Sequence, residues 1–300
     1  MAHIIDLHSA WQQASQQVSL IQRHALKTHR RLYRISVIFV ARGTDEAILQ
    51  SLNTILSQDL VREIIIVSCT TSVSLNNKLY DIAREHPRVF LLFQNPDLSL
   101  SKAYNLGLRH STSKYLLLVS APYLLPKNIV VKLLAPGLTK PSHWIMGIQS
   151  AFYSSFDPFF RFQKNSFYKQ GNSILEKERI HHVVSVMPDC LLVSYDMVRE
   201  MGALDTACDE NNVLLDLCLR VHTAGGDVFG HTALKFSSAS LPETKVSLKQ
   251  LDRLWKSWHH YYQKHFSQSY RKRHACMLYI KLFIKIIAAM IRNPKNPSFC

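Results

Sequence analysis

The feature that most constrains this chain is the regular alternation of apolar runs and amphipathic segments across residues 35–119. The apolar runs, at 35–40, 63–67, 89–93 and 115–119, are continuous rather than alternating in polarity. Between them, residues 45–57, 76–85 and 101–110 have the apolar spacing of helices. Strands that alternate with helices predict βαβ units in a parallel sheet, and uninterrupted apolar strands predict that both faces of the sheet are covered.

The rest of the chain is less regular. Residues 4–30 have helical periodicity, and 190–194 and 195–201 predict a further strand and a short helix. The stretch 142–185 is rich in aromatic residues, for which core packing and an acceptor-side surface are both open interpretations. We expect an N-terminal helical extension at 1–34, an α/β domain at 35–248 and a basic helical segment at 249–300.

The formal net charge of +15 is concentrated at the two ends of the chain. Residues 1–34 hold five Lys/Arg against one acid, and residues 249–300 hold eleven against one, which leaves 20 basic and 19 acidic residues in 35–248. An enzyme that binds nucleic acid usually carries its basic surface on the folded body. Basic flanks are typical of proteins on anionic membranes, so the distribution favours an anionic membrane surface over nucleic acid as a partner.

The most apolar stretch is 277–291, MLYIKLFIKIIAAMI, which is too short to span a bilayer because a spanning helix needs about 20 residues. Lys281, Lys285 and Arg292 share one helical face. This pattern predicts a helix lying in the interface of an anionic leaflet, with packing against the core or a partner as the alternative. The six cysteines form no C-x-x-C pair, so we expect free thiols and a cytoplasmic protein peripheral at the inner face of a bacterial membrane.

Several motifs occur in order along residues 35–240. They are A-x-N-x-G at Ala103, Asn105 and Gly107, Gly202-Ala203-Leu204-Asp205, Asp216-Leu217-Cys218-Leu219-Arg220, and Ala224-Gly225. Together with the flanking apolar strands they resemble family 2 glycosyltransferases of the GT-A fold, in particular the rhamnosyltransferase-like branch. The segment WHHYYQKHF at 258–266 resembles the aromatic-basic segment that follows the catalytic domain there. The resemblance implies an α/β GT-A fold, with a mainly parallel sheet flanked by helices and with added N- and C-terminal helices.

Members of that family transfer a sugar from a nucleotide-sugar to an acceptor hydroxyl with inversion, and the resemblance implies three acidic positions. One acid recognises the base, an acidic pair holds Mg²⁺ or Mn²⁺ on the diphosphate, and one acid deprotonates the acceptor. In this chain the three positions are occupied by Ser68-Cys69, Ser120-Ala121-Pro122 and Val213-Leu214. The metal site of the family is therefore lost from the sequence, and the chain is a pseudoenzyme candidate.

Fixed cations can neutralise a diphosphate in place of a metal. The donor-binding candidates are the residues expected at the strand ends and on the loop-helix, namely Arg42, Ser68, Lys102, Asn105 and Ser120. Ordinary surface charge is the alternative explanation of the cations Arg42, Lys102 and Arg109.

Three acids near the vacant base position are catalytic candidates: Asp209, Glu210 and Asp216. For the first two the alternative is a solvated loop acid, and for Asp216 it is a local ion pair with Arg220 at helical spacing. The histidine pairs His181-His182 and His259-His260 lack the i, i+4 spacing of a helical metal site, so the sequence assigns no metal.

Two functions remain open from the sequence. The chain is either a glycosyltransferase that builds a surface glycan, such as lipopolysaccharide or capsule, from a nucleotide-sugar donor and a glycan or glycolipid acceptor, or a catalytically inactive protein of the same fold that acts as a binding or scaffold subunit. The ordered motifs favour the first and the three vacant acidic positions favour the second.

Overall fold

The computed structural model describes residues 34–42, 45–120, 123–137, 144–148, 180–183, 186, 190–208, 212–231, 237–238, 248–267, 275–280 and 283–284. The helix predicted at 4–30, most of the aromatic-rich stretch 142–185, and the candidate acids Asp209 and Glu210 lie outside the described residues.

The first half of the chain folds as the alternation predicts. Its elements are β1 (Ile35–Ala41), α2 (Asp45–Leu56), β2 (Val61–Ser68), α3 (Val73–Glu85), β3 (Val89–Phe93), α4 (Leu100–His110) and β4 (Tyr115–Ser120). Ser72 and Ser99 begin α3 and α4, since each hydroxyl accepts a hydrogen bond from a backbone N–H of the first turn. The predicted strands and helices of this half are confirmed, with boundaries that move by a few residues.

In the second half, β8 (Cys190–Ser194) and α8 (Tyr195–Glu200) are the strand and short helix predicted at 190–201, and α10 (Leu248–Phe266) lies in the segment predicted to be helical at 249–300. The sequence did not indicate the other elements, which are β5 (Tyr123–Leu124), α5 (Ile129–Gly137), β6 (Trp144–Ile148), β7 (Ile180–His182), α9 (Val213–Thr223), β9 (Asp227–His231) and β10 (Ser237–Ser238).

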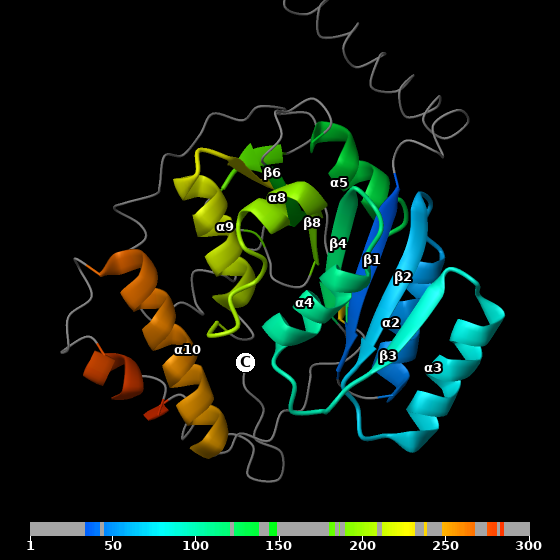
Figure 1. Cartoon of the computed structure of the whole chain (residues 1–300), viewed down its shortest axis with the longest axis horizontal. Coiled ribbons are helices and arrows are strands. Elements are labelled where there is room, and N and C mark those ends of the chain that lie inside the picture. The colour runs from blue at the N-terminus through cyan, green and yellow to red at the C-terminus, as the bar shows by residue number, and fades with distance from the viewer. Residues whose placement is uncertain are drawn as a thin grey trace, which may run out of the picture.

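The strands form a mixed eight-stranded sheet in the order β3-β2-β1-β4-β8-β6-β9-β7 (Figure 1). The four strands from β3 to β4 are mutually parallel, β8 is antiparallel to both β4 and β6, and β5 pairs with β10 in a separate ribbon. From β1 the chain adds β2 on one side and later β4 on the other side. Open α/β sheets bind ligands beyond the carboxyl ends of the strands at such a switch point.

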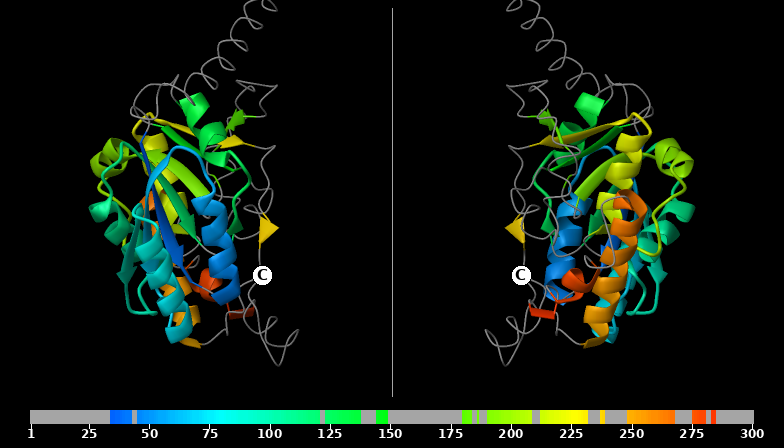
Figure 2. Two further views of the ribbon diagram at one scale, coloured as in Figure 1. Left: turned by 90° about the vertical axis from the view of Figure 1, so that its right-hand side faces the viewer. Right: turned by 90° about the vertical axis from the view of Figure 1, so that its left-hand side faces the viewer.

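Helices cover both faces of the sheet, as Figure 2 shows for α2 and α10 on opposite sides. Successive residues of β1 alternate between the two cores, with Ile38 and Val40 on the side of α4, α8, α9 and α10, and Val37 and Phe39 on the side of α2, α3 and α5. Because both sides are apolar, the strands read as continuous hydrophobic runs.

Helix α10 belongs to this core, although it lies in the basic segment predicted at 249–300. Its side chains Trp258, Tyr261, Tyr262 and Phe266 are all buried and join the cluster that includes α4 and α9. In the described part of the chain, no helix is both long and apolar enough to cross a membrane.

Gly107 allows α4 to approach β1. A Cβ built at this position would overlap Cγ2 of Ile38 and lie 3.3 Å from its Cβ and Cγ1. Ile38 is fully buried in the middle of β1, so it has little room to move. The glycine of the A-x-N-x-G motif is therefore explained by helix–sheet packing.

We predict that Gly107→Ala destabilises the protein by about 1–3 kcal/mol, because the added methyl overpacks the α4–β1 contact. Chemical denaturation measures this. The double variant Gly107→Ala/Ile38→Ala should be more stable than the sum of the single changes implies, since the truncated Ile38 makes room for the methyl. Additive effects would show that the contact with Ile38 is not the cause.

Candidate functional site

The carboxyl ends of β1, β2 and β4 meet at one edge of the sheet, which we call the strand-end edge. Ala41 lies beside Ser68, and Val40 lies beside Ser120. The backbone N–H of Cys69 donates to the carbonyl oxygen of Ala41 over 3.1 Å, which continues the pairing past the end of β2. The register thus brings together three of the predicted donor-binding residues, Arg42, Ser68 and Ser120.

Arg42 lies against Cys69 at this edge. Burial raises the pKa of the Cys69 thiol, and the charge and a hydrogen bond of the Arg42 side chain offset part of that rise. Ser68 is 1% exposed, and its hydroxyl donates to Oδ1 of Asn76 over 2.8 Å. The strand-end edge therefore presents the half-buried side chains of Arg42 and Ser120 to a ligand, whereas the Ser68 hydroxyl is buried against Asn76.

The other two donor-binding candidates lie on α4. Lys102 is exposed in the first turn of this helix. The side-chain amide of Asn105 is engaged twice by one residue, since it donates to the carbonyl oxygen of Leu204 over 2.7 Å and accepts from its N–H over 3.0 Å. This pair of bonds fastens α4 to the loop after α8, so Asn105 has a structural task, and its role in donor binding stays a prediction.

The residues at the vacant acidic positions do not fit the divalent metal of the family. The described residues that end the three strands, Ala41-Arg42, Ser68-Cys69 and Ser120, include no carboxylate. Mg²⁺ and Mn²⁺ require oxygen ligands such as carboxylates, and Arg42 adds a positive charge instead. At the base position, Val213 and Leu214 are the first two residues of α9, and both side chains are fully buried in the core.

The third catalytic candidate, Asp216, is fully buried in α9 and has three partners. Its Oδ2 is 2.8 Å from Nε of Arg220, and its Oδ1 is 2.8 Å from Nζ of Lys264 and 2.7 Å from Nε2 of His265. Burial on its own would raise the pKa of this carboxyl, but the hydrogen bond from His265 and the charges of Arg220 and Lys264 hold it below its ordinary value.

This geometry confirms the alternative role of Asp216 as the ion-pair partner of Arg220. A carboxylate with a lowered pKa and no exposed surface is a weak general base, since proton abstraction requires access and a matched pKa. Its catalytic role stays a prediction that the geometry does not favour.

Lys264 connects Asp216 to a second carboxylate, Asp205. Oδ2 of Asp205 accepts from Nζ of Lys264 over 2.6 Å and is 2.9 Å from Nε2 of His260. Burial would raise the pKa of Asp205, but the hydrogen bonds from Lys264 and His260 lower it well below its usual range. The two carboxylates thus hold one face of α10 against the α8–α9 region, where α10 lies beside α9 (Figure 1).

The sequence did not identify His260, Lys264 and His265 as a functional group. The signal was present in the segment 258–266, where these polar residues recur at helical spacing between buried aromatic residues. Their partners could not be named from the sequence, because Asp205 and His260 are 55 residues apart.

The mixed sheet, its switch point and the helices on both faces define the GT-A nucleotide-sugar transferase fold. The chain belongs to glycosyl transferase family 2, whose model matches residues 36–202, more than half of the chain. Among curated proteins, none matches this chain significantly.

The solved structures that resemble most of this chain include two glycosyltransferases. The crystal structure of GalNAc-T7 with UDP, GalNAc and Mn²⁺ has a TM-score of 0.53 and 14% identity over 89% of this chain, which spans only 59% of that protein. The mannosyltransferase PcManGT from Pyrobaculum calidifontis, in complex with GDP-Man and Mn²⁺, has a TM-score of 0.56 and 14% identity over 95% of this chain and 85% of its own. At this identity the likeness concerns the fold alone.

We predict that Asp216→Asn destabilises the protein by about 3–5 kcal/mol near neutral pH, because it leaves buried cationic partners without their counter-charge. The matched control is Asp196→Asn, which breaks an exposed pair with Arg199 at 3.7 Å and should cost about 1 kcal/mol or less. Denaturation curves of both variants and the wild type measure this.

The same comparison has a pH dependence with a defined sign. The folded-state pKa values of Asp205 and Asp216 are lowered from 3.8, so their contribution to stability is complete above that value and is lost as the pH falls through the folded pKa values. The stability gap between wild type and Asp216→Asn should therefore shrink only below about pH 4. A gap that closes between pH 8 and 5 would contradict this assignment.

Proposed function

We propose that this chain is a glycosyltransferase that transfers a sugar with inversion from a nucleotide-sugar to a surface-glycan or glycolipid acceptor, with fixed cations in place of the family's divalent metal. The observation that carries the proposal is the strand-end edge. The switch point of this family 2 fold lies at that edge. Arg42 follows β1 there, and the sequence has no acid at the position where the family's metal-binding acids follow β4.

The chemistry requires charge neutralisation at one point and proton removal at another. The acceptor oxygen forms a bond to the anomeric carbon while the bond from that carbon to the diphosphate oxygen breaks, and the diphosphate leaves with the electron pair. Arginine binds phosphate oxygens bidentately, so Arg42, with Lys102, suits the leaving group. The acceptor proton passes to a base, for which Asp209 and Glu210 are our candidates, ahead of Asp216 because of the latter's three partners.

A second function has its own support, namely a catalytically inactive subunit that binds or positions other components of glycan assembly. Leu214 stands buried where the family has a carboxylate, and both Asp205 and Asp216 are committed to binding α10. Donor binding without turnover would favour this scaffold role, which keeps the fold and the strand-end edge but needs no base.

Membrane association is the third part of the proposal. The helical residues 275–280 and 283–284 pack against the core cluster that contains α10. Leu278 of this segment is fully buried, and Nε1 of Trp255 in α10 donates to the carbonyl oxygen of Ala275 over 3.2 Å. The outer side of this segment is apolar and 40–58% exposed, and it consists of Met277, Tyr279, Ile280, Phe283 and Ile284.

An exposed apolar helix face within a strongly basic segment fits an anionic lipid surface. We infer that the protein lies at the inner face of a bacterial membrane, where a glycolipid acceptor for lipopolysaccharide or capsule would be found. The segment beyond Ile284 is outside the described residues, so its contribution rests on the sequence alone.

We predict that the protein binds a nucleotide-sugar in the presence of a metal chelator and that Arg42→Ala weakens this binding by about tenfold to 100-fold, the effect of losing one charge-assisted contact. Calorimetry against UDP-, GDP- and dTDP-sugars, with chelator and with Mn²⁺, measures this, and Lys102→Ala tests the second cation.

The matched control is Arg84→Ala, which removes an exposed cation in the last turn of α3, at the opposite end of that helix from the strand-end edge. It should bind the donor like the wild type. Absence of binding to every donor would refute donor recognition, and binding that requires Mn²⁺ would refute the fixed-cation version.

We also predict that Ile280→Glu/Ile284→Glu abolishes binding to liposomes that contain anionic lipid, because it places two charges in the apolar face. Co-sedimentation at low and physiological salt measures this. Val73→Glu is the matched control, since Val73 is 72% exposed on α3, outside the proposed face. Equal loss in the control, or retention in the double variant, would show that this face does not bind lipid.

A further inference from the structure

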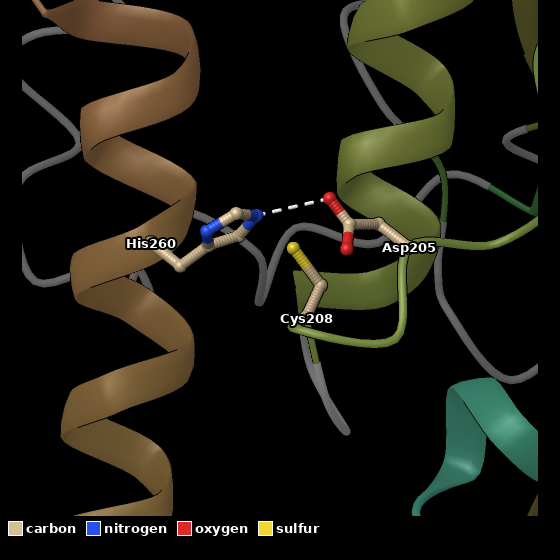
Figure 3. Close-up of side chains that lie close together, drawn as sticks. All are labelled: Asp205, Cys208 and His260. Atoms are coloured by element: carbon tan, nitrogen blue, oxygen red, sulfur yellow. Dashed lines mark hydrogen bonds and ion pairs between the residues drawn. The ribbon is translucent and has the colours of Figure 1, made fainter.

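Three side chains of different elements converge at the contact between α10 and the body: Asp205, Cys208 and His260. One ligand atom from each lies within 4.8 Å of the other two. Asp205 and Cys208 come from the loop between α8 and α9, and His260 reaches them from α10 (Figure 3). Within the described residues no other group of three His, Cys, Asp or Glu side chains converges in this way.

The donor set has a definite chemical preference. A thiolate, an imidazole and a carboxylate are the ligands of Zn²⁺, whereas Mg²⁺ and Ca²⁺ select oxygen atoms only. Three protein ligands leave one tetrahedral position for water. Cys208 is fully buried, while the side chains of Asp205 and His260 are 21% and 40% exposed, so an ion would enter from the side of His260.

The loop holds its two ligands in place by its own hydrogen bonds. Oδ1 of Asp205 accepts from the N–H of Ala207 over 2.9 Å, and the N–H of Cys208 donates to the carbonyl oxygen of Asp205 over 3.2 Å. Oδ2 of Asp205 remains directed at His260, as the dashed line in Figure 3 shows. The carboxylate oxygen and the thiol are thus positioned before any ion arrives.

We propose that Asp205, Cys208 and His260 form a binding site for a zinc-type divalent cation, which joins α10 to the loop between α8 and α9. The site uses none of the residues of the strand-end edge, and the proposal does not depend on sugar transfer.

Lys264 is the group that competes with the ion, since its Nζ lies 2.6 Å from the same Oδ2 of Asp205. Nζ of Lys264 also lies 2.8 Å from Oδ1 of Asp216. The ammonium can therefore remain paired with Asp216 when Asp205 binds the metal. The contact with the ammonium of Lys264 also indicates that a positive charge is stabilised next to Oδ2 of Asp205.

The thiol adds a pH dependence. Burial raises the pKa of the Cys208 thiol and the charges of Asp216 and Asp205 raise it further, while the charges of Lys264 and Arg220 offset part of this rise, so binding of the ion must displace a proton. Metal affinity should therefore increase as the pH rises from 6 to about 8.

The test uses the full chain, stripped of metal with a chelator and titrated with Co²⁺ and then with Zn²⁺ in competition. We expect one ion per chain, a thiolate-to-cobalt charge-transfer band, and the intense visible absorption of four-coordinate Co²⁺. Cys208→Ser and His260→Ala should each weaken binding by about 100-fold or more, since even outer-shell partners change affinity about 10- to 100-fold. Zn²⁺ should raise the thermal midpoint of the wild type but not of these variants.

Two controls separate this site from incidental metal binding. Cys276→Ser removes an exposed thiol. His259→Ala removes a histidine that is adjacent to His260 in the sequence but stacks on Trp255. Neither change should alter metal binding. Lys264→Met should bind Zn²⁺ at least as tightly as the wild type, because the competing cation is gone. A wild-type protein without the charge-transfer band, or with a band that survives Cys208→Ser or disappears with Cys276→Ser, overturns the proposal.

Discussion

The parallel pairing of β1 with β2 on one side and β4 on the other is the interaction on which the rest of the structure depends. It divides the apolar residues of β1 between two cores and places the ends of three strands at one edge, with Ala41 beside Ser68 and Val40 beside Ser120. Gly107 lets α4 pack against the same strand. A binding edge and a stable core therefore follow from one register.

The charged residues at the strand-end edge and those at the α10 contact differ in kind and in their partners. Arg42 and Lys102 lie at or near the strand-end edge, where the described ends of β1, β2 and β4 include no carboxylate. Asp205 and Asp216 lie at the α10 contact, where Lys264 bridges them. Asp205 and Asp216, the acids that match the family motifs, thus stabilise the packing of α10 against the body. The charged side chains proposed to contact a diphosphate at the strand-end edge are cations. This separation supports recognition of an anionic donor more than it supports a family-type metal mechanism.

Secondary structure is predicted best from the sequence where the spacing of apolar residues within a short segment identifies a strand or a helix. Strands β1 to β4 and helices α2 to α4 follow from the change between continuous apolar runs and helical periodicity. Helix α9 gives no such contrast, because nearly all of it from Val213 to Val221 is buried and its apolar residues occupy every side. The cluster of Asp205, Cys208 and His260 is beyond local reasoning, since adjacent histidines look incidental until α10 is placed against a loop some 50 residues earlier.

The central claim is that a diphosphate binds at the strand-end edge through fixed cations. A crystal structure of the chain with UDP or GDP, grown in chelator, tests it most directly. The account predicts diphosphate oxygens within hydrogen-bond distance of the Arg42 guanidinium, beyond the carboxyl ends of β1 and β4. A nucleotide bound elsewhere, or one seen at this edge only when Mn²⁺ is added and bound through that metal, would contradict it.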